Sequence, residues 1–567
     1  MEKIWLKNYP ANVPSKLPPL TKNLIQRFEE TCREFSNKSA YISFDKTLSY
    51  EELYQKSMHL ASFLQAQGFK KGDVIVIQLP NLLQYPISVW ASLMAGLTVV
   101  NMNPLYTARE MLKPIKETKA KGIILLSNKL TELNQILDQT ALQKVLVTEP
   151  ADLLDFPKKQ LINLIFKYKM KTFKQKAFKQ KVSFLKALKE GSKSKAQIIQ
   201  RDLNEICFIQ YTGGTTGVSK GACLTQRNIL SNLKQCEIWM LSYLKKGDEK
   251  ALSALPLYHI FAFLVNGLVY FFNGYSNVLI ANPRQINSLV KVIKKQKITL
   301  GTGVNTLFKA LLDNKYFRKL DFSNLKLFIS GGMSLQPSVQ KNWESLTKSS
   351  LIEGYGLTEA SPVVCVGRLD KPVEGSVGYP LPSTEIRVVD EEGKSLGSNQ
   401  EGELEVKGPQ VMMGYYNQQA ETQLVLNKEG WLKTGDIVRV NEKGLVSIID
   451  RKKDMINISG LKVYPNQVEE LLSSFTKVQE SAVVGAQRED GSEYIKAFIV
   501  KKEDTLTEKE LISYCKKNLA PYKIPKEFVF IKEIPKNIIG KALRRLLKDN
   551  KKQKNDNANG SGFKTAS

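Results

Sequence analysis

The sequence is poor in the residues that build disulfides and transition-metal sites. Its 567 residues include six cysteines and two histidines, and no two cysteines form a C-x-x-C pair. Closely spaced cysteines are typical of disulfide-rich secreted domains and of zinc sites, so the sequence argues against both. We therefore expect free thiols, a reducing cytosol and a cytoplasmic protein.

Long apolar segments are also scarce. Residues 1–20 carry three lysines, one glutamate and four prolines, so we expect no signal peptide. Residues 251–283 contain no charged residue, which raises the question of a membrane span. Because proline, glycine, asparagine and histidine interrupt this stretch, we predict a strand, a loop, a buried helix and a second strand, with a membrane span as the alternative.

Acidic residues are few beside the basic ones, 55 against 83, and the formal net charge is +28. Such an excess favours anionic partners, which include nucleotides, acidic lipid surfaces and nucleic acid. A lysine-rich host proteome explains it equally well. We find no zinc-finger or RRM signature and expect no nucleic-acid partner.

The basic excess is greatest in residues 157–195, where thirteen lysines face a single acid, Glu190. Leucine, isoleucine, phenylalanine and tyrosine are interspersed among them. Two interpretations stand side by side: a basic amphipathic element that lies on an anionic membrane, or a solvated insertion. The first predicts association with the inner face of the membrane.

A glycine- and threonine-rich loop follows an apolar run at residues 206–209. Glycines let the backbone approach a ligand, and the hydroxyls, free N–H groups and lysine present donors to an anion, so an oligophosphate is the natural guest. The Walker pattern is absent, since no Gly precedes Lys220 and no Ser or Thr follows it. A flexible surface turn is the alternative. The candidate ligands are Tyr211, Thr212, Gly213, Gly214, Thr215, Thr216, Gly217 and Lys220.

Hydrophobic patterning predicts an α/β fold, α+β overall. Short β-branched runs at 74–77, 97–102, 123–126 and 145–147 alternate with helical stretches at 82–93 and 107–113, which favours βα-layered, mostly parallel sheets. Short strands from about residue 378 predict a small β-rich subdomain. A mixed α+β piece follows residue 450, and residues 551–567 are polar enough to be disordered.

Further motifs follow in order at residues 256–262, 330–332, 353–359, 430–436, 450–454, 458–465 and 535–541. Together with the loop they resemble the adenylate-forming superfamily of acyl-CoA synthetases, luciferases and peptide-synthetase adenylation domains. Within it, the bacterial long-chain fatty acyl-CoA synthetases are the most similar branch. Glu429 and residues 537–539 depart slightly from the family pattern without removing a functional group.

The resemblance implies the roles of single residues. Thr212 and Glu359 would hold Mg²⁺, Asp436 the ribose, and His259 would lie beside the acyl pocket, whereas as a lone residue it would more often be a core group. Lys541 would neutralise charge during adenylation. Catalytic roles are implied for His259, Thr358, Glu359 and Lys541, and nucleotide or CoA binding for Gly331, Gly332, Tyr355, Gly356, Asp436, Arg451, Lys453, Gly460 and Lys462.

The implied reaction has two steps. A fatty acid and ATP form an acyl-adenylate and pyrophosphate, and coenzyme A then takes the acyl group after a small mobile domain swings about a hinge near Lys453. The expected domains are an N-terminal extension (1–45), a large AMP-binding domain (46–450), a small C-terminal domain (451–550) and a tail (551–567).

Several alternatives stay open. They are a medium-chain or aryl-CoA ligase, a fatty acyl-AMP ligase and, from another class, a basic membrane- or nucleic-acid-binding protein with a vestigial nucleotide site. The sequence also leaves a homodimer open.

Overall fold

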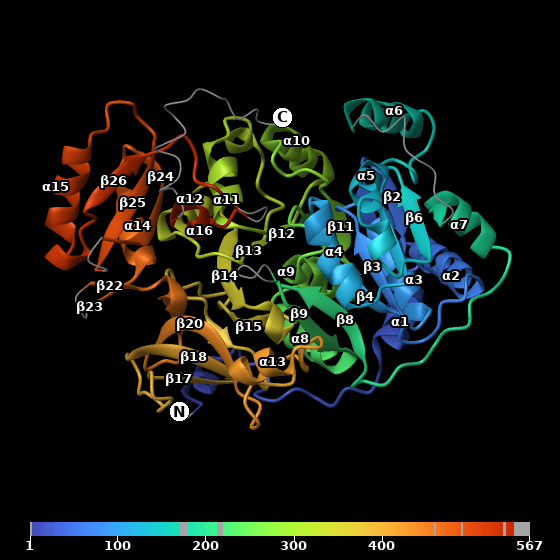
Figure 1. The fold of residues 1–567 in the computed structure, drawn as a ribbon, viewed down its shortest axis with the longest axis horizontal. Coiled ribbons are helices and arrows are strands. Elements are labelled where there is room, and N and C mark those ends of the chain that lie inside the picture. Colours follow the sequence, from blue (N-terminus) through green and yellow to red (C-terminus); the bar gives the residue numbers. More distant parts are fainter. Residues whose placement is uncertain are drawn as a thin grey trace. The chain divides into compact units, whose positions relative to one another are not determined.

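The computed structural model describes residues 3–170, 180–212, 219–458, 461–488, 492–536 and 540–548. The chain packs as two compact units (Figure 1). The large unit holds Lys3–Ile386 and Val406–Leu432, and the small unit holds Met1–Glu2, Arg387–Glu405 and Lys433–Ser567.

An eight-stranded sheet carries the glycine- and threonine-rich loop of residues 211–220, which we call the phosphate loop after its predicted ligand. Strands β3 to β8 pair in parallel with their neighbours, whereas β9 and β19 run antiparallel at one edge. Every residue of β3 and β5 is buried, as a parallel sheet covered on both faces requires. The spatial order is β19 (Gly414–Tyr415), β9 (Gly221–Thr225), β8 (Ile206–Tyr211), β4 (Thr98–Asn101), β3 (Val74–Gln78), β5 (Gly122–Leu126), β6 (Lys144–Thr148) and β7 (Lys181–Ser183).

A nine-stranded sheet forms the second layer of strands in the large unit. It is parallel through its centre and antiparallel at both edges. The order is β16 (Tyr379–Pro380), β15 (Val363–Val366), β14 (Ser350–Gly356), β13 (Leu327–Ser330), β12 (Leu300–Gly303), β10 (Lys250–Ser253), β11 (Ser276–Leu279), β1 (Ser39–Ser43) and β2 (Lys46–Ser49).

Helices accompany both sheets, and local sequence signals explain where they begin. In α2, Ser49 and Glu52 form a reciprocal capping box, which satisfies two backbone N–H groups at the helix start. The helices of the large unit are α1 (Leu24–Glu34), α2 (Tyr50–Ala66), α3 (Gln84–Met94), α4 (Ala108–Glu117), α5 (Leu130–Asn134), α6 (Lys158–Met170), α7 (Phe184–Gly191), α8 (Gln226–Leu241), α9 (Ile260–Ala262), α10 (Ile286–Gln296), α11 (Asn305–Asp313), α12 (Pro337–Thr347) and α13 (Gln419–Val425).

The uncharged stretch 251–283 folds as predicted. It runs from β10 through a loop into α9, continues as a π-helix at Phe263–Tyr270 and ends in β11. All eight residues of the π-helix are buried, so the stretch belongs to the core. Among the residues that the structure describes, no helix has the length and apolar character needed to cross a membrane.

The small unit contains mostly antiparallel sheets and three helices among its described residues. Its apolar core gathers around Val468, Val483, Ile499 and Leu511. The elements are a sheet of β17 (Glu385–Val389), β18 (Glu401–Lys407), β20 (Leu432–Val440) and β21 (Val446–Arg451), a pair of β22 (Ile456–Ile458) and β23 (Leu461–Val463), a sheet of β24 (Val478–Gln487), β25 (Glu493–Lys501) and β26 (Glu527–Phe530), and the helices α14 (Pro465–Ser474), α15 (Glu508–Asn518) and α16 (Arg544–Lys548).

The α/β class is confirmed, with two large sheets, a β-rich sheet and a smaller mixed unit. The two packing units do not coincide with the expected domain ranges, because most of the β17 to β21 sheet packs with the C-terminal part. The range 1–45 already contributes buried Trp5 and strand β1. The domain ranges stay a prediction, and residues 551–567 lie outside the described part.

Candidate active site

The phosphate loop connects β8 to β9 in the large unit. Tyr211 ends β8 and its hydroxyl donates to Glu117 at 2.8 Å. Thr212 donates its backbone N–H to the carbonyl of Lys220 at 2.9 Å, which closes the base of the loop. Gly213, Gly214, Thr215, Thr216 and Gly217 lie outside the described residues.

Lys220 at the end of this loop has an anionic partner. Its ammonium forms a part-buried ion pair with Glu421 of α13. The same ammonium lies 5.1 Å from the ring centroid of Tyr415, within the range of a cation–π interaction. The Glu421 carboxylate therefore occupies the place beside the Lys220 ammonium that an anionic ligand would need.

Tyr415 also reaches Glu359, and this links two predicted ligands. The Tyr415 hydroxyl donates to a Glu359 carboxylate oxygen at 2.7 Å, and the Glu359 carbonyl accepts the N–H of Met412 at 2.8 Å. Thr358 and Glu359 form a short 3₁₀ turn just after β14. The loop lysine and the candidate metal ligand thus share one tyrosine.

The carboxylate of Glu359 suits Mg²⁺, a hard cation that binds few protein oxygens and takes its other ligands from water and phosphates. Among the described residues, no group of three or more His, Cys, Asp or Glu side chains is placed to hold a metal. A site with one carboxylate fits a cation that arrives with a phosphate substrate.

Gly331 and Gly332 follow β13, and Tyr355 and Gly356 end the neighbouring strand β14. A Cβ on Gly331 would lie 2.9 Å from the ring of Phe261. At Gly356 a Cβ would lie 1.9 Å from the carbonyl oxygen of Pro362, so no side chain fits there. At both positions a neighbouring group occupies the space that a side chain would need.

Glu353 of β14 and His259 are partly buried. Burial raises the pKa of Glu353 to about 8, so this carboxyl is mostly protonated at neutral pH. His259 begins α9, and burial lowers the pKa of its imidazole to about 4. At neutral pH His259 therefore offers a hydrogen bond rather than a positive charge.

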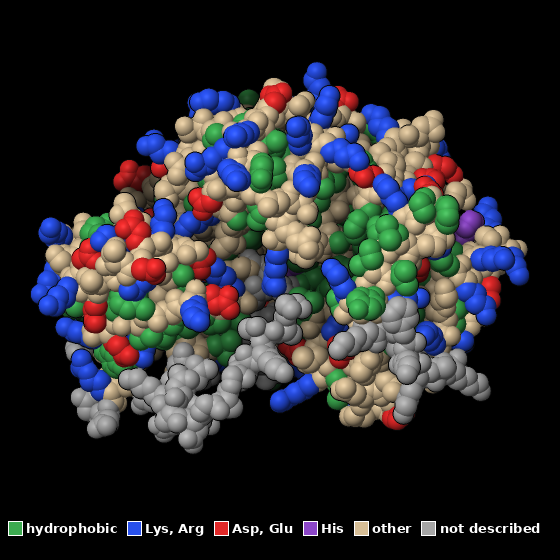
Figure 2. Space-filling view, turned by 90° about the horizontal axis from the view of Figure 1, so that it is seen from above, with side chains coloured by type: hydrophobic (Ala, Val, Ile, Leu, Met, Phe, Trp, Pro, Cys, Tyr) green, Lys and Arg blue, Asp and Glu red, His purple; other side chains and the backbone are tan. Residues whose placement is uncertain are grey.

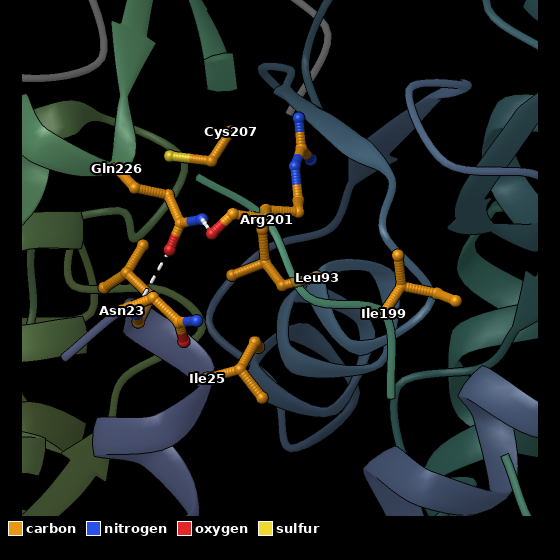
Figure 3. Close-up of a pocket in the computed structure, with 8 residues that line it drawn as sticks. Asn23, Ile25, Leu93, Ile199, Arg201, Cys207 and Gln226 are labelled. Carbon is orange, nitrogen blue, oxygen red and sulfur yellow. Dashed lines mark hydrogen bonds between the residues drawn. The ribbon is translucent and has the colours of Figure 1, made fainter. Parts of the chain in front are cut away.

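A small cavity in the large unit is not a substrate pocket. It measures about 10 Å³ and lies between Leu93, Arg201 and Cys207, room for about one water molecule. Figure 3 shows how Gln226 closes it, accepting from the backbone N–H of Leu24 at 3.0 Å and donating to the carbonyl of Arg201 at 3.1 Å. The cavity is therefore a small gap in the packing, and the Gln226 amide closes it.

The small unit brings three predicted residues together. Asp436 in β20 and Arg451 in β21 are cross-strand partners, and the Arg451 guanidinium nitrogen Nε lies 2.6 Å from an Asp436 oxygen. Asp436 is 2% exposed. Its backbone N–H donates to Thr434, so the strand holds this carboxylate in a fixed place.

Lys541 belongs to the same charge cluster. Burial and, to a smaller extent, the nearby Arg451 lower the pKa of its ammonium to about 8, while Asp436 and Asp454 oppose these effects. The ammonium is thus desolvated, as an electrostatic catalyst in a dry site would be. Asp436, Arg451 and Lys541 form one cluster within one unit.

The remaining predicted residues of the small unit follow Arg451 closely in the sequence. Lys453 stands in a 3₁₀ turn, and burial lowers its pKa. Lys462 of β23 pairs with Glu391 at 2.6 Å. Gly460 lies outside the described residues.

Sequence reasoning missed Tyr415 and Glu421, which contact the loop lysine, and Arg544, which binds Glu469 at 2.8 Å and Asp454 at 3.0 Å. A part-buried lysine beside a phosphate loop favours a counter-ion, and this preference is the signal that was available. The sequence does not say which of the many acids supplies it.

Comparison with known proteins places these features in a family. The family model "AMP-binding enzyme" matches residues 28–416, and the model "AMP-binding enzyme C-terminal domain" matches residues 467–541. The first match contains the phosphate loop, Glu359 and Tyr415. The second ends at Lys541.

Relatives cover nearly the whole chain. A long-chain-fatty-acid–CoA ligase of Escherichia coli O157:H7 is 43% identical over 98% of this chain and 100% of the relative. ATP-bound MatB from Rhodopseudomonas palustris has 26% identity and a TM-score of 0.80, covering 93% of this chain and 99% of MatB. The anthranilate CoA ligase AuaEII has 22% identity, covers 95% and 99%, and shares the fold at a TM-score of 0.84. With both family models in order around the loop, Glu359 and Lys541, this chain belongs to the AMP-binding enzyme family.

Proposed function

We propose that this chain is an AMP-forming long-chain-fatty-acid–CoA ligase. The observation that carries the proposal is the end-to-end similarity to relatives of that name, at 43% identity over 98% of the chain. The carboxylate of a fatty acid attacks the α-phosphorus of ATP, the bond to pyrophosphate breaks, and an acyl-adenylate forms. The thiol of coenzyme A then attacks the acyl carbon, loses its proton, and AMP departs.

The large unit would hold the phosphates. Lys220 would exchange Glu421 for phosphate oxygens, and the loop N–H groups would donate to the same anion. Glu359, oriented by the Tyr415 hydroxyl, and Thr212 would bind Mg²⁺, which neutralises phosphate charge when bound. Tyr355 would stack on the adenine. The backbone at Gly331 and Gly356 would pack against the same base.

The small unit would supply the other charges. Asp436 would accept hydrogen bonds from the ribose hydroxyls, and Lys541 would stabilise the negative charge that develops between carboxylate and α-phosphate. A rotation near Lys453 would then exchange Lys541 for the segment around Gly460 and Lys462, where coenzyme A reacts. His259, neutral at physiological pH, would orient the acyl group.

The protein would work at the inner face of the membrane as a peripheral protein, alone or as a homodimer. The +28 net charge supports attraction to anionic lipid.

Replacing Glu421 with glutamine should tighten ATP binding. The ion pair with Lys220 is part-buried, and exposed or part-exposed pairs contribute about 0.2–1 kcal/mol. Without this carboxylate, ATP has no competitor for Lys220, so the KM of the variant for ATP should be lower by about two- to fivefold. Steady-state kinetics with Glu421→Gln test this, and Glu442→Gln, an exposed acid of the small unit, is the control. An unchanged or higher KM in Glu421→Gln would show that the pair does not compete with ATP.

The function itself is tested by pyrophosphate release from the full chain with Mg-ATP and saturated fatty acids from short to long. We expect release to peak at long chains, and acyl-CoA to form only when coenzyme A is present. Release without use of coenzyme A would indicate a fatty acyl-AMP ligase. Release that peaks with short or aromatic acids would indicate a different acyl specificity, and no release with any acid would reject the ligase.

A further inference from the structure

Helix α6 turns its apolar stripe outward. Leu161, Leu164, Ile165 and Tyr168 follow the i, i+3, i+4, i+7 spacing that puts side chains on one face of a helix. In a globular protein such a face packs on the core. Here the four side chains are 59%, 58%, 45% and 78% exposed.

Helix α7, in the same lysine-rich stretch, shows the ordinary arrangement. Phe184, Ala187, Leu188 and Gly191 have the same spacing, and all four are buried. In α6 no residue is buried. The outward stripe of α6 is therefore a property of this helix and not of its surroundings.

The opposite side of α6 is fixed to the large unit by polar contacts. The Asn163 amide accepts from the N–H of Ala151 at 2.9 Å and donates to Asp152 at 3.1 Å, and Lys167 lies 3.6 Å from Glu149. Because these bonds set which face points inward, the exposure of the apolar stripe is anchored by the fold.

Aromatic side chains extend the apolar surface at the start of α6. Phe156 is 80% exposed, and exposed Phe44 lies in the β1–β2 turn, where Asp45 pairs with Lys158 at 3.5 Å. We call Phe44, Phe156, Leu161, Leu164, Ile165 and Tyr168 the α6 face.

Lysines border the α6 face. Lys46 pairs with Asp155 at 3.0 Å and Lys295 pairs with Asp45 at 2.8 Å, so two acids are also present. Lys158, Lys159, Lys167 and Lys169 lie on α6 itself, which carries no acid. Figure 2 shows hydrophobic side chains gathered among lysines and arginines over this side of the large unit.

Three explanations of an exposed apolar face are a membrane span, a contact with a second copy of the chain and a contact with a bilayer surface. Length and charge distinguish them. A span is excluded by length, because the 13 residues of α6 extend only about 20 Å at 1.5 Å per residue. A second copy would bring its own basic border against this one, which repels. An anionic bilayer surface supplies both an apolar interior and the opposite charge.

We propose that the α6 face is the docking surface for an anionic lipid bilayer, with its apolar side chains entering the interface and its lysines among the headgroups. The proposal rests on the proposed function, because long-chain fatty acids partition into bilayers. Docking there would bring the enzyme to the phase that holds its substrate.

Co-sedimentation with vesicles tests the proposal. We expect the full chain to bind vesicles of phosphatidylglycerol and phosphatidylethanolamine, and to bind pure phosphatidylcholine at least about tenfold more weakly. The Leu161→Ser/Leu164→Ser/Tyr168→Ser variant should bind the anionic vesicles about tenfold more weakly than the parent. These side chains are exposed, so the fold should not depend on them. Tyr316→Ser/Val373→Ser removes apolar side chains that are exposed elsewhere and should bind as the parent does.

Equal vesicle binding by the triple variant and the parent would overturn the proposal, as would a parent that does not bind. Light scattering without lipid adds a further outcome: a dimer that dissociates in the triple variant would assign the face to a second copy and also overturn it. Adenylation of a short soluble acid, measured without vesicles, should be the same in both proteins. If neither protein adenylates an acid of any chain length, the proposed function is rejected and the vesicle result is judged by itself.

Discussion

Replacing Lys541 with alanine should slow formation of the acyl-adenylate by about 10²–10³-fold, the usual effect of removing one preorganised charge from a developing oxyanion. Lys541 is partly buried within its unit, and this burial lowers the pKa of its ammonium. A charge in such surroundings interacts more strongly with a phosphate than a solvated one does. The transfer of acyl groups from a preformed acyl-adenylate to coenzyme A should change far less.

The measurement is a comparison of the two half-reactions, pyrophosphate release and thioester formation from synthetic acyl-adenylate. Lys536→Ala is the matched control, because Lys536 stands five positions earlier and pairs with Glu480. It should leave both half-reactions near the parent's rates. Equal loss of both half-reactions in Lys541→Ala would remove Lys541 from the adenylation step.

The pKa of Lys541 adds a pH dependence with a definite sign. The pKa of about 8 lies below the usual value of 10.5, so the ammonium is charged at pH 6 and loses its proton as the pH rises through about 8. Adenylation by the parent should therefore decline on the alkaline side of pH 8. In Lys541→Arg, whose guanidinium stays charged, the rate should be lower and this decline should disappear.

Most of the fold could be predicted from local sequence patterns. The parallel strands β3 to β6 were predictable because short β-branched runs buried on both faces alternate with helices. Asp436, Arg451 and Lys541 were indicated by the resemblance of their motifs to a family, and their roles stay predictions. In each case the information lies within a few neighbouring residues.

Features that depend on tertiary packing could not be predicted from local sequence patterns. The spacing of apolar residues is the same in α6 and α7, and it identifies a stripe without saying which way the stripe faces. The ion pair of Lys220 with Glu421 joins residues 201 positions apart, and no periodicity marks such a pair. Both features follow from tertiary contacts.

Replacing Asp436 with alanine should abolish recognition of the ribose. A hydrogen bond to a charged group contributes about 1.5–3 kcal/mol, so the loss of two such bonds should raise the KM for ATP by at least about 100-fold. Arg451, the present partner of Asp436, is part-exposed and can be hydrated when the carboxylate is gone. A general collapse of the unit is therefore not expected, and Asp436→Asn, which keeps the shape of the side chain, should show a smaller loss.

The assignment to the ribose is tested by a cycle that changes enzyme and nucleotide together. The parent should use 2′-deoxy-ATP and 3′-deoxy-ATP less well than ATP, because each lacks a hydroxyl that the carboxylate binds. Asp436→Ala should treat all three nucleotides alike, since the acceptor of those hydroxyls is absent. If Asp436→Ala still discriminates by the parent's factor, the hydroxyls are bound elsewhere, and the buried carboxylate serves to hold Arg451 beside Lys541. Under either assignment, losing the negative charge of Asp436 should lower the pKa of Lys541 further and move the alkaline decline in adenylation to lower pH, so the nucleotide comparison alone decides between them.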